Sequence, residues 1–218
     1  MMRLHLLCAG MLFVAVTLAA GPATAQEPRL AGRLSPGARA TVDAVLDSAR
    51  RDGLPLEPLV DRALEGATKG AGDDRIVAAV RRLAADLTAA RDAFGPGVAD
   101  AEIAAGASAL RAGARGEDLT RLRTLRPGQS VTVAAAVLTD LVALGVPPDT
   151  ATAAVLSLAE LADDATYLAF RRNVERDVAL GATPVAALTY RLFTEGRALQ
   201  SSDEAATPGA GPNRPRKP

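Results

Sequence analysis

Residues 145–151, GVPPDTA, contain in order the signals that end one helix and begin the next. A glycine just after a helix adopts the left-handed conformation that stops it, and the apolar residue that follows packs back on the last turn. Pro148 suits the first position of a new helix, and Asp149 faces the positive end of its dipole. Looser versions of this stretch begin at Gly53, Gly70, Gly97, Gly113 and Gly181. The sequence therefore predicts a repeated tight corner between helices.

Between these corners, the apolar residues follow a helical period. Within residues 74–94, Ile76, Val80, Leu83 and Leu87 recur at spacings of three and four, and charged residues occupy the other faces. The same pattern, in shorter form, occupies residues 42–49, 56–64, 151–158 and 167–178. Each of these segments is expected to be an amphipathic helix with one buried stripe.

Residues 131–144, VTVAAAVLTDLVAL, are apolar nearly all round, which predicts a helix buried on most sides at the centre of the fold. Aromatic residues make up only 3% of the chain, and long alternating segments are absent. We therefore expect an all-α fold, an irregular multi-helix array or bundle of amphipathic helices joined by short corners that begin with glycine. The corners are unequally spaced, which argues against a uniform solenoid, while a degenerate array of helical repeats is an alternative.

The first 25 residues have the layout of a cleaved signal peptide. Arg3 precedes an apolar run over residues 6–18, and residues 23–25, Ala-Thr-Ala, form a small-residue cleavage site. The run is shorter than the about 20 residues of a membrane span. The expected product is a secreted or periplasmic protein with no membrane span.

The rest of the chain divides by composition. Residues 26–34 are expected to be a linker, residues 35–199 a helical domain, and residues 200–218 a disordered tail without bulky apolar residues. A subdomain break near residues 95–97 is suggested by the Gly-Pro-Gly sequence there. The tail ends in Arg214, Arg216 and Lys217, for which contact with anionic lipid or glycan is the alternative to a solvated tail.

Cleavage of the signal peptide would remove several kinds of chemistry. The single His and Cys, His5 and Cys8, and all three methionines lie in the first 25 residues, and the chain has no Trp. Nucleophilic triads, the usual metal ligand sets and disulfides would then be excluded, so we expect neither a metal nor another cofactor. Losing Arg3 from 25 basic side chains leaves 24 against 25 acidic ones, a net charge of −1 that argues against nucleic acid.

The densest basic cluster is a candidate interaction surface, and we call it the arginine cluster. In a helix over residues 117–125, Leu119 and Leu122 would point inward and Arg121 outward. Such a cationic surface would fit an acidic partner or a phosphorylated glycolipid, although an ordinary solvated face is the simpler interpretation. It lacks the interleaved aromatics that stack on bases. The cluster consists of Arg111, Arg115, Arg121, Arg123 and Arg126.

Three other features of the sequence are candidate catalytic or ligand-binding sites. The adjacent acids Asp73-Asp74, Glu117-Asp118 and Asp163-Asp164 lie at expected helix starts, where capping is a better explanation than general acid and base catalysis. Asp140, inside the apolar helix, is expected to form an ion pair rather than to act as a catalytic acid. The aromatics near the end of the domain are expected to pack in the core, with a ligand pocket as the alternative; they are Tyr167, Phe170, Tyr190 and Phe193.

Three function classes follow from these features. The first is an exported helical interaction or scaffold module that is not an enzyme and binds an unknown protein in the cell envelope. The second is a carrier of an apolar or lipid-like ligand in a helical cavity. The third is an enzyme that cleaves glycans with carboxylates alone, which would need two carboxylates across an open cleft.

Overall fold

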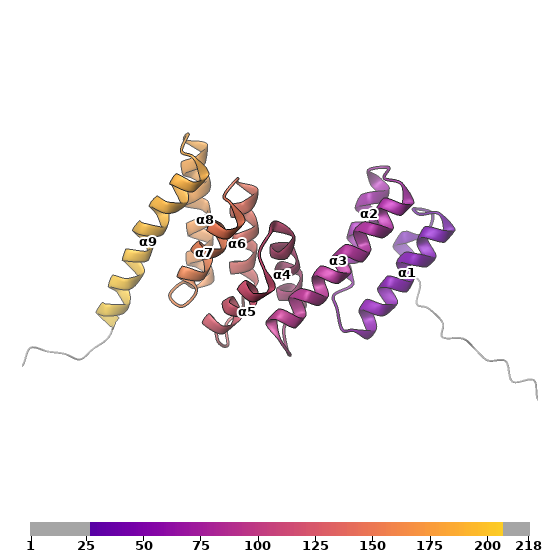
Figure 1. Ribbon diagram of the computed structural model, residues 1–218, viewed down its shortest axis with the longest axis horizontal. Helices are drawn as coiled ribbons and strands as arrows, with labels where there is room; N and C mark the ends of the chain where they lie inside the picture. The colour runs from indigo at the N-terminus through magenta and orange to yellow at the C-terminus, as the bar shows by residue number, and fades with distance from the viewer. Residues whose placement is uncertain (1–26, 207–218) are drawn as a thin grey trace, which may run out of the picture.

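The computed structural model describes residues 27–206, and within this part the chain is all-helical, with nine α-helices and no strand (Figure 1). The predicted signal peptide and residues 207–218 of the predicted tail lie outside the described residues. None of the described helices combines the length and apolar character needed to cross a membrane. The elements are η1 (Pro28–Leu30), α1 (Pro36–Arg51), α2 (Glu57–Thr68), α3 (Asp73–Phe94), α4 (Asp100–Ala112), α5 (Gly116–Leu125), α6 (Thr132–Ala143), α7 (Pro148–Leu158), α8 (Asp164–Ala179) and α9 (Pro184–Ala206).

The helices form an elongated array of two layers. In one layer α1 packs against α3, α3 against α5, α5 against α7, and α7 against α9; in the other α4 packs against α6, and α6 against α8. Helices consecutive in the chain, such as α3 with α4 and α8 with α9, join the layers. The chain therefore advances from one end of the array to the other, with α1 and α9 at opposite ends (Figure 1).

The corner at Gly145 has the hydrogen bonds of a Schellman motif. Gly145 has a φ of 99°, and its N–H donates to the carbonyl oxygen of Val142. The N–H of Val146 donates to the oxygen of Leu141, and the Val146 side chain is buried against the preceding helix. The new helix begins at Pro148, as its position predicts. The same pair of backbone bonds, with a positive φ, recurs at Gly53, Gly70, Gly113 and Gly181.

Gly97 is different, although its φ is also positive at 78°. Helix α3 ends at Phe94, so Gly95 occupies the position after the helix, and Gly97 lies farther along the connection to α4. The residue after Gly95 is Pro96, which has no N–H to donate to the end of the helix. A Schellman motif therefore cannot form at the end of α3, and Gly97 is not a helix-ending corner of the predicted kind.

The core runs continuously through the array, on both sides of residues 95–97. Helix α6 packs against α4, α7 and α8, so it is central to the C-terminal part of the array, as its apolar sequence predicts. Its buried side chains are Ala134, Ala135, Val137, Leu138 and Leu141. Its contact with α7, together with the contact of α8 with α9, joins the two layers over the second half of the domain.

Both ends of the expected helical domain extend further than its predicted bounds. In the segment expected to be a linker, Leu30 is fully buried, and the Arg29 guanidinium binds both Glu57 carboxylate oxygens at 2.6 and 2.8 Å. At the other end, α9 continues to Ala206, past the position where the tail was expected to begin. The short helix η1 thus caps the N-terminal end of the array by packing against α2.

Candidate functional site

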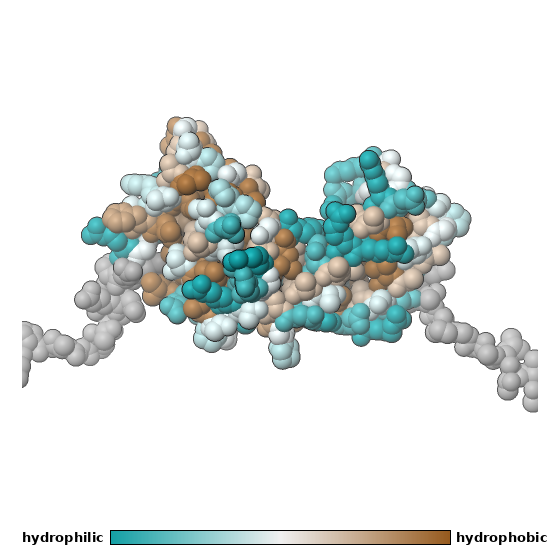
Figure 2. All heavy atoms as spheres, viewed as in Figure 1, coloured by the Kyte–Doolittle hydropathy of each residue, from teal (hydrophilic) through white to brown (hydrophobic). Residues whose placement is uncertain are grey.

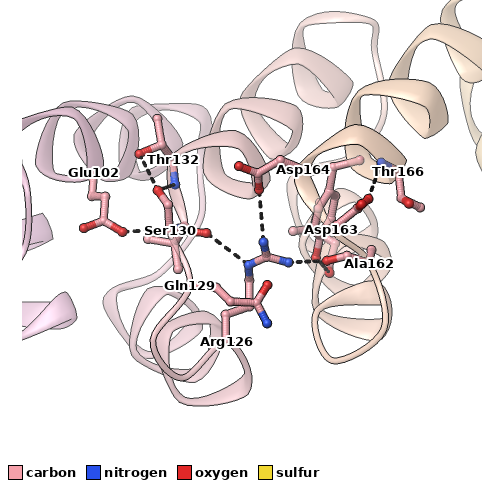
Figure 3. A network of polar contacts seen from close by, with 12 residues as sticks. Glu102, Arg126, Gln129, Ser130, Thr132, Ala162, Asp163, Asp164 and Thr166 are labelled. Atoms are coloured by element: carbon pink, nitrogen blue, oxygen red, sulfur yellow. Dashed lines mark hydrogen bonds and ion pairs between the residues drawn. The ribbon is translucent and has the colours of Figure 1, made fainter.

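The structure divides the arginine cluster, because Arg126 is buried rather than on the surface. Only 1% of Arg126 is exposed, and its guanidinium donates to the carbonyl oxygens of Ser130 and Ala162 and to the Asp164 carboxylate (Figure 3). It also lies over the ring of Tyr167, 5.2 Å from the centroid. Arg126 therefore connects the corner before α6 to the corner before α8, and its prediction as a surface residue is wrong.

Arg123 is also tied into the fold, through the buried residue Glu102. The Arg123 guanidinium pairs with the Glu102 carboxylate and donates to the Gln129 carbonyl oxygen at 2.9 Å. Glu102 also accepts the backbone N–H groups of Ala99 at 3.1 Å and Val131 at 2.9 Å. Burial would raise the pKa of Glu102, but these donors outweigh it and lower that pKa below its ordinary value. Glu102 was not singled out from the sequence, because two of its partners lie more than twenty residues away.

The three remaining arginines do not form a single cationic face. Arg115 pairs with Asp118 at 3.1 Å and with Glu117 at 3.0 Å, at the start of α5. Arg111 and Arg121 are exposed and have no ion pair with any described residue. Arg115 and Arg121 line an open hollow of about 360 Å³ between α5 and α7, but Asp118 and Asp149 line it too. The charges of this hollow therefore balance, and it offers little to an anionic ligand.

The adjacent acids lie at helix starts, as predicted. Asp118 accepts the backbone N–H of Arg115 at 3.0 Å. Asp163 accepts the N–H of Thr166 at 2.8 Å, and bonds from Thr166 lower the pKa of Asp163 (Figure 3). The remaining pair, Asp73 and Asp74, occupies the first turn of α3. These positions favour the capping interpretation.

Asp140 and the aromatic residues each differ in part from expectation. Asp140 pairs with Arg171 at 3.5 Å, as expected, but its side chain is 48% exposed and is not inside the core.

Tyr167 and Phe170 are fully buried, and burial raises the pKa of Tyr167 to about 12. Tyr190 and Phe193 are 58% and 62% exposed, so the expectation of core packing is wrong for them. They lie on α9, and no further described helix covers them.

The second layer of the array is interrupted between α2 and α4. Among the described helices, α4 packs against α6 and α6 against α8, whereas α2 does not pack against α4 in this way. The interruption leaves an open hollow of about 300 Å³, which we call the α2–α4 groove; Figure 2 shows the dip in the surface at this place. Leu83 and Leu87 of α3 form its floor. Its walls are Pro58, Asp61, Arg62 and Glu65 of α2 and Ala104, Ser108 and Arg111 of α4.

The α2–α4 groove combines an apolar floor with polar groups that lack partners. Arg111 on one wall has no ion pair with a described residue, although its charge acts on Asp86 of α3. The Nε of Arg62 on the other wall is buried without a hydrogen-bond partner among the described residues; so is one carboxylate oxygen of Asp86, which is near Arg111 but does not line the groove. Burial raises the pKa of Asp86, and the charges of Arg111 and Arg82 oppose that rise. This groove is therefore the candidate site.

Comparisons with protein-family models, with curated proteins and with solved structures returned no match for this chain.

Proposed function

We propose that this protein is an exported helical interaction module, which acts by binding rather than by catalysis and seats one amphipathic helix of a partner protein in the α2–α4 groove. The observation that carries the proposal is the interruption of the second layer. The position between α2 and α4 is where the packing of α4, α6 and α8 would place another helix. A helix from a partner would restore the pattern that the chain itself breaks.

The floor of the groove supports a helix as the occupant. Leu83 and Leu87 lie one turn apart on α3 beneath the groove; Leu83 is 6% exposed and Leu87 is fully buried, so an apolar side chain of a partner helix would pack against Leu83. Ala104 and Ser108 on the α4 wall are small, and small residues allow helix axes to approach to about 8 Å. A volume of about 300 Å³ accepts the side chains of one helix face rather than a whole folded domain.

The polar groups of the groove define the chemistry of the partner. Arg111 favours a carboxylate on the partner helix, because this guanidinium has no ion pair within the described chain. We therefore infer an amphipathic helix with an acidic residue beside its apolar stripe. The predicted signal peptide places this partner in the cell envelope or outside the cell.

The shape and the charges of the α2–α4 groove fit the other two function classes, a ligand carrier and a glycan-cleaving enzyme, less well. The groove is open to solvent along one side, which suits docking better than the enclosed storage of an apolar ligand. Its two carboxylates, Asp61 and Glu65, both come from α2, one turn apart, and Glu65 is paired with Arg62 and Lys69. A glycan-cleaving enzyme would instead place its two carboxylates on opposite sides of the bond.

The test is to block the groove and to measure partner binding in the native cell envelope. A photo-crosslinking amino acid at Glu65, on the rim, should capture one partner, and the cross-linked peptide should have an amphipathic helical sequence with an acidic residue. Ser108→Trp, on the α4 wall, should reduce capture at least tenfold without lowering the melting temperature. The matched control is Ser48→Trp, which fills a different open hollow between α1 and α3. Equal capture by both tryptophan variants, or loss only with Ser48→Trp, would contradict the proposal.

A further inference from the structure

The exposed large apolar side chains of the described chain gather at one end of the array. All of them lie in the loop before α8, on α8, in the corner after α8 or on α9, and none lies in the first six helices. They are Leu161, Leu168, Leu180, Val185, Tyr190 and Phe193. Scattered exposed apolar residues are ordinary, but their concentration on a single terminal pair of helices indicates a contact surface.

Helix α9 has two different faces. Ala187 and Leu188 are buried on the side that packs against α8, whereas Val185, Tyr190 and Phe193 are exposed on the other. We call the exposed residues of this second side, together with Leu180 at the preceding corner, the α9 face. Leu180 is 80% exposed, the largest fraction among them. Figure 2 shows brown, hydrophobic residues open to solvent over this end of the molecule.

The aromatic rings of the α9 face are held in place by arginines. The Arg191 guanidinium lies 5.3 Å from the centroid of the Tyr190 ring, and that of Arg197 lies 5.4 Å from the Phe193 ring. Arg191 is itself fixed by Asp177 of α8, with hydrogen bonds of 2.6 and 2.7 Å. Rings that are already ordered lose less conformational entropy when a partner covers them.

The position of α9 in the array explains why this face is open. Within its layer, α3, α5 and α7 are each covered on both sides by a neighbouring helix, but α9 is the last described helix and has a neighbour on one side only. Helical arrays usually end in a helix with a polar outer face, which keeps the end soluble. The N-terminal end follows this rule, because η1 covers α2 there and none of the residues described at that end exposes a large apolar side chain. The C-terminal end does not follow it.

We propose that the α9 face binds the α9 face of a second copy of this chain, in a two-fold symmetric dimer. Head-to-tail stacking would need a matching apolar patch at the N-terminal end, and the described residues there expose none. Among the described residues, the exposed large apolar side chains that can match the α9 face therefore lie at the same end of the array, and this favours an isologous contact. The proposal concerns a different surface from the α2–α4 groove and does not depend on the function proposed for it.

The size of the face is sufficient for a dimer. The exposed parts of its four apolar side chains amount to on the order of 400 Å² in each copy. Burying this area on both copies, with a polar rim around it, reaches about the 1,000 Å² at which specific interfaces begin. An interface of this size predicts a dimer that dissociates at low protein concentration rather than a permanent one.

The first experiment measures mass in solution. Analytical ultracentrifugation of the exported protein at concentrations from about 1 to 100 μM should show a monomer–dimer equilibrium. Tyr190→Ser with Phe193→Ser should weaken the association at least tenfold and leave the melting temperature unchanged, because both side chains are already exposed. The matched control is Leu168→Ser, which removes an exposed apolar residue outside the α9 face and should leave association unchanged. A wild-type monomer throughout this range would overturn the proposal.

The second experiment tests the symmetry of the contact. Thr189→Cys on α9 and Thr124→Cys on α5 replace exposed threonines whose hydroxyls bond one turn back in the same way. Each is made in a Cys8→Ser background, because Cys8 is the only native cysteine. Under mild oxidation Thr189→Cys should form a disulfide-linked dimer and Thr124→Cys should not. Equal cross-linking of the two would overturn the proposal, and so would a monomer that binds anionic lipid vesicles through Tyr190 and Phe193.

Discussion

Arg126 lies over the ring of Tyr167, with its guanidinium carbon 5.2 Å from the ring centroid, and both side chains are buried. The tyrosine hydroxyl donates to the carbonyl oxygen of Val155 at 2.8 Å, and the arginine donates to Ala162 and Asp164. The two residues therefore join the end of α5 to the consecutive helices α7 and α8. This contact is structural, and its removal should be detected as a loss of stability.

Arg126→Ala should lower the free energy of unfolding by about 2–4 kcal/mol, because the buried carbonyl oxygen of Ala162 and the partly buried one of Ser130 lose their donor and the space beneath Tyr167 is left empty. Loss of the ion pair with Asp164 should contribute less to this destabilisation, since the Asp164 side chain is 47% exposed and water can replace the arginine. The control, Arg121→Ala, removes an exposed arginine of α5 and should change stability by less than about 0.5 kcal/mol. Urea unfolding of both variants checks the prediction, and equal stabilities would contradict the structural role of Arg126.

Glu102→Gln should reduce stability at neutral pH by about 1–3 kcal/mol, because a neutral amide is a weaker partner for Arg123 than a carboxylate. The pKa of Glu102 is lowered in the folded protein. Its contribution is therefore fully present above the unfolded value of about 4.3, and it is lost as the pH falls through the lower folded value. The stability difference between wild type and variant should accordingly narrow as the pH falls below about 4.

Two comparisons isolate the effect of Glu102. Other carboxylates with lowered pKa values, such as Asp118 and Asp177, titrate in wild type and variant alike, so they cancel in the difference. Glu160→Gln changes an exposed glutamate and should alter stability by less than about 0.5 kcal/mol at neutral pH. A difference between wild type and Glu102→Gln that stays constant from pH 7 to pH 3 would show that the charge of Glu102 is unimportant.

The helices and most of their corners could be predicted because their signals are local. The periodicity of residues 74–94 and the apolar run of residues 131–144 match α3 and α6 within one or two residues. The Gly145 corner depends on contacts within one turn, which adjacent residues determine. In contrast, α4 is rich in alanine, so its apolar face is indistinct in the sequence and it was not identified as a separate helix.

The candidate site depends on tertiary contacts, and the sequence could not predict it. Arg126 was placed on the surface because its neighbours are basic, whereas its partners Ala162 and Asp164 lie more than thirty residues away. The α2–α4 groove exists because α2 and α4 both pack against α3 but do not pack closely against each other, and no local pattern encodes such a gap. Tyr190 and Phe193 have a helical spacing typical of a core, and only the order of helices in the array shows that α9 has no cover.

Gly106→Ala should destabilise the fold, because α4 approaches α3 closely at this residue. A Cβ atom at Gly106 would lie 2.5 Å from a ring carbon of Phe94 and 3.0 Å from the Cβ of Ala90. Phe94 is buried and cannot move without disturbing the core, so we expect a loss of about 1–3 kcal/mol. Gly196→Ala is the control, since nothing lies within 4 Å of its added Cβ, and it should be neutral or slightly stabilising. Thermal unfolding of both variants gives the comparison.

Substitutions at Gly113 and Gly181 distinguish two causes of strain at the corners, the positive φ and a close contact with a neighbouring side chain. Their φ angles are nearly equal, at 107° and 104°. A Cβ at Gly113 would lie 2.9 Å from the Cγ of Pro148, whereas nothing lies within 4 Å of a Cβ at Gly181. Gly181→Ala should therefore lower the free energy of unfolding by about 1 kcal/mol, the cost of placing a side chain in the left-handed region. Gly113→Ala should lower it by about 1 kcal/mol more, because of the contact with Pro148. Equal losses, measured by urea unfolding, would show that Pro148 moves away without penalty.

Gly145→Val tests whether the stretch that predicts the fold serves structure or function. At a φ of 99° a β-branched side chain is strained, and we expect a loss of about 1–2 kcal/mol, although the added Cβ would meet Pro184 only at an ordinary 3.5 Å. Asp149→Asn should lose less than about 0.5 kcal/mol, because Asp149 is exposed in the first turn of α7 and the variant keeps a polar side chain. If the stretch instead formed a binding site, Asp149→Asn would abolish partner capture while its melting temperature matched that of wild type. Thermal unfolding and photo-crosslinking from Glu65, applied to both variants, distinguish these outcomes, and a Gly145→Val protein as stable as wild type would show that the corner does not need glycine.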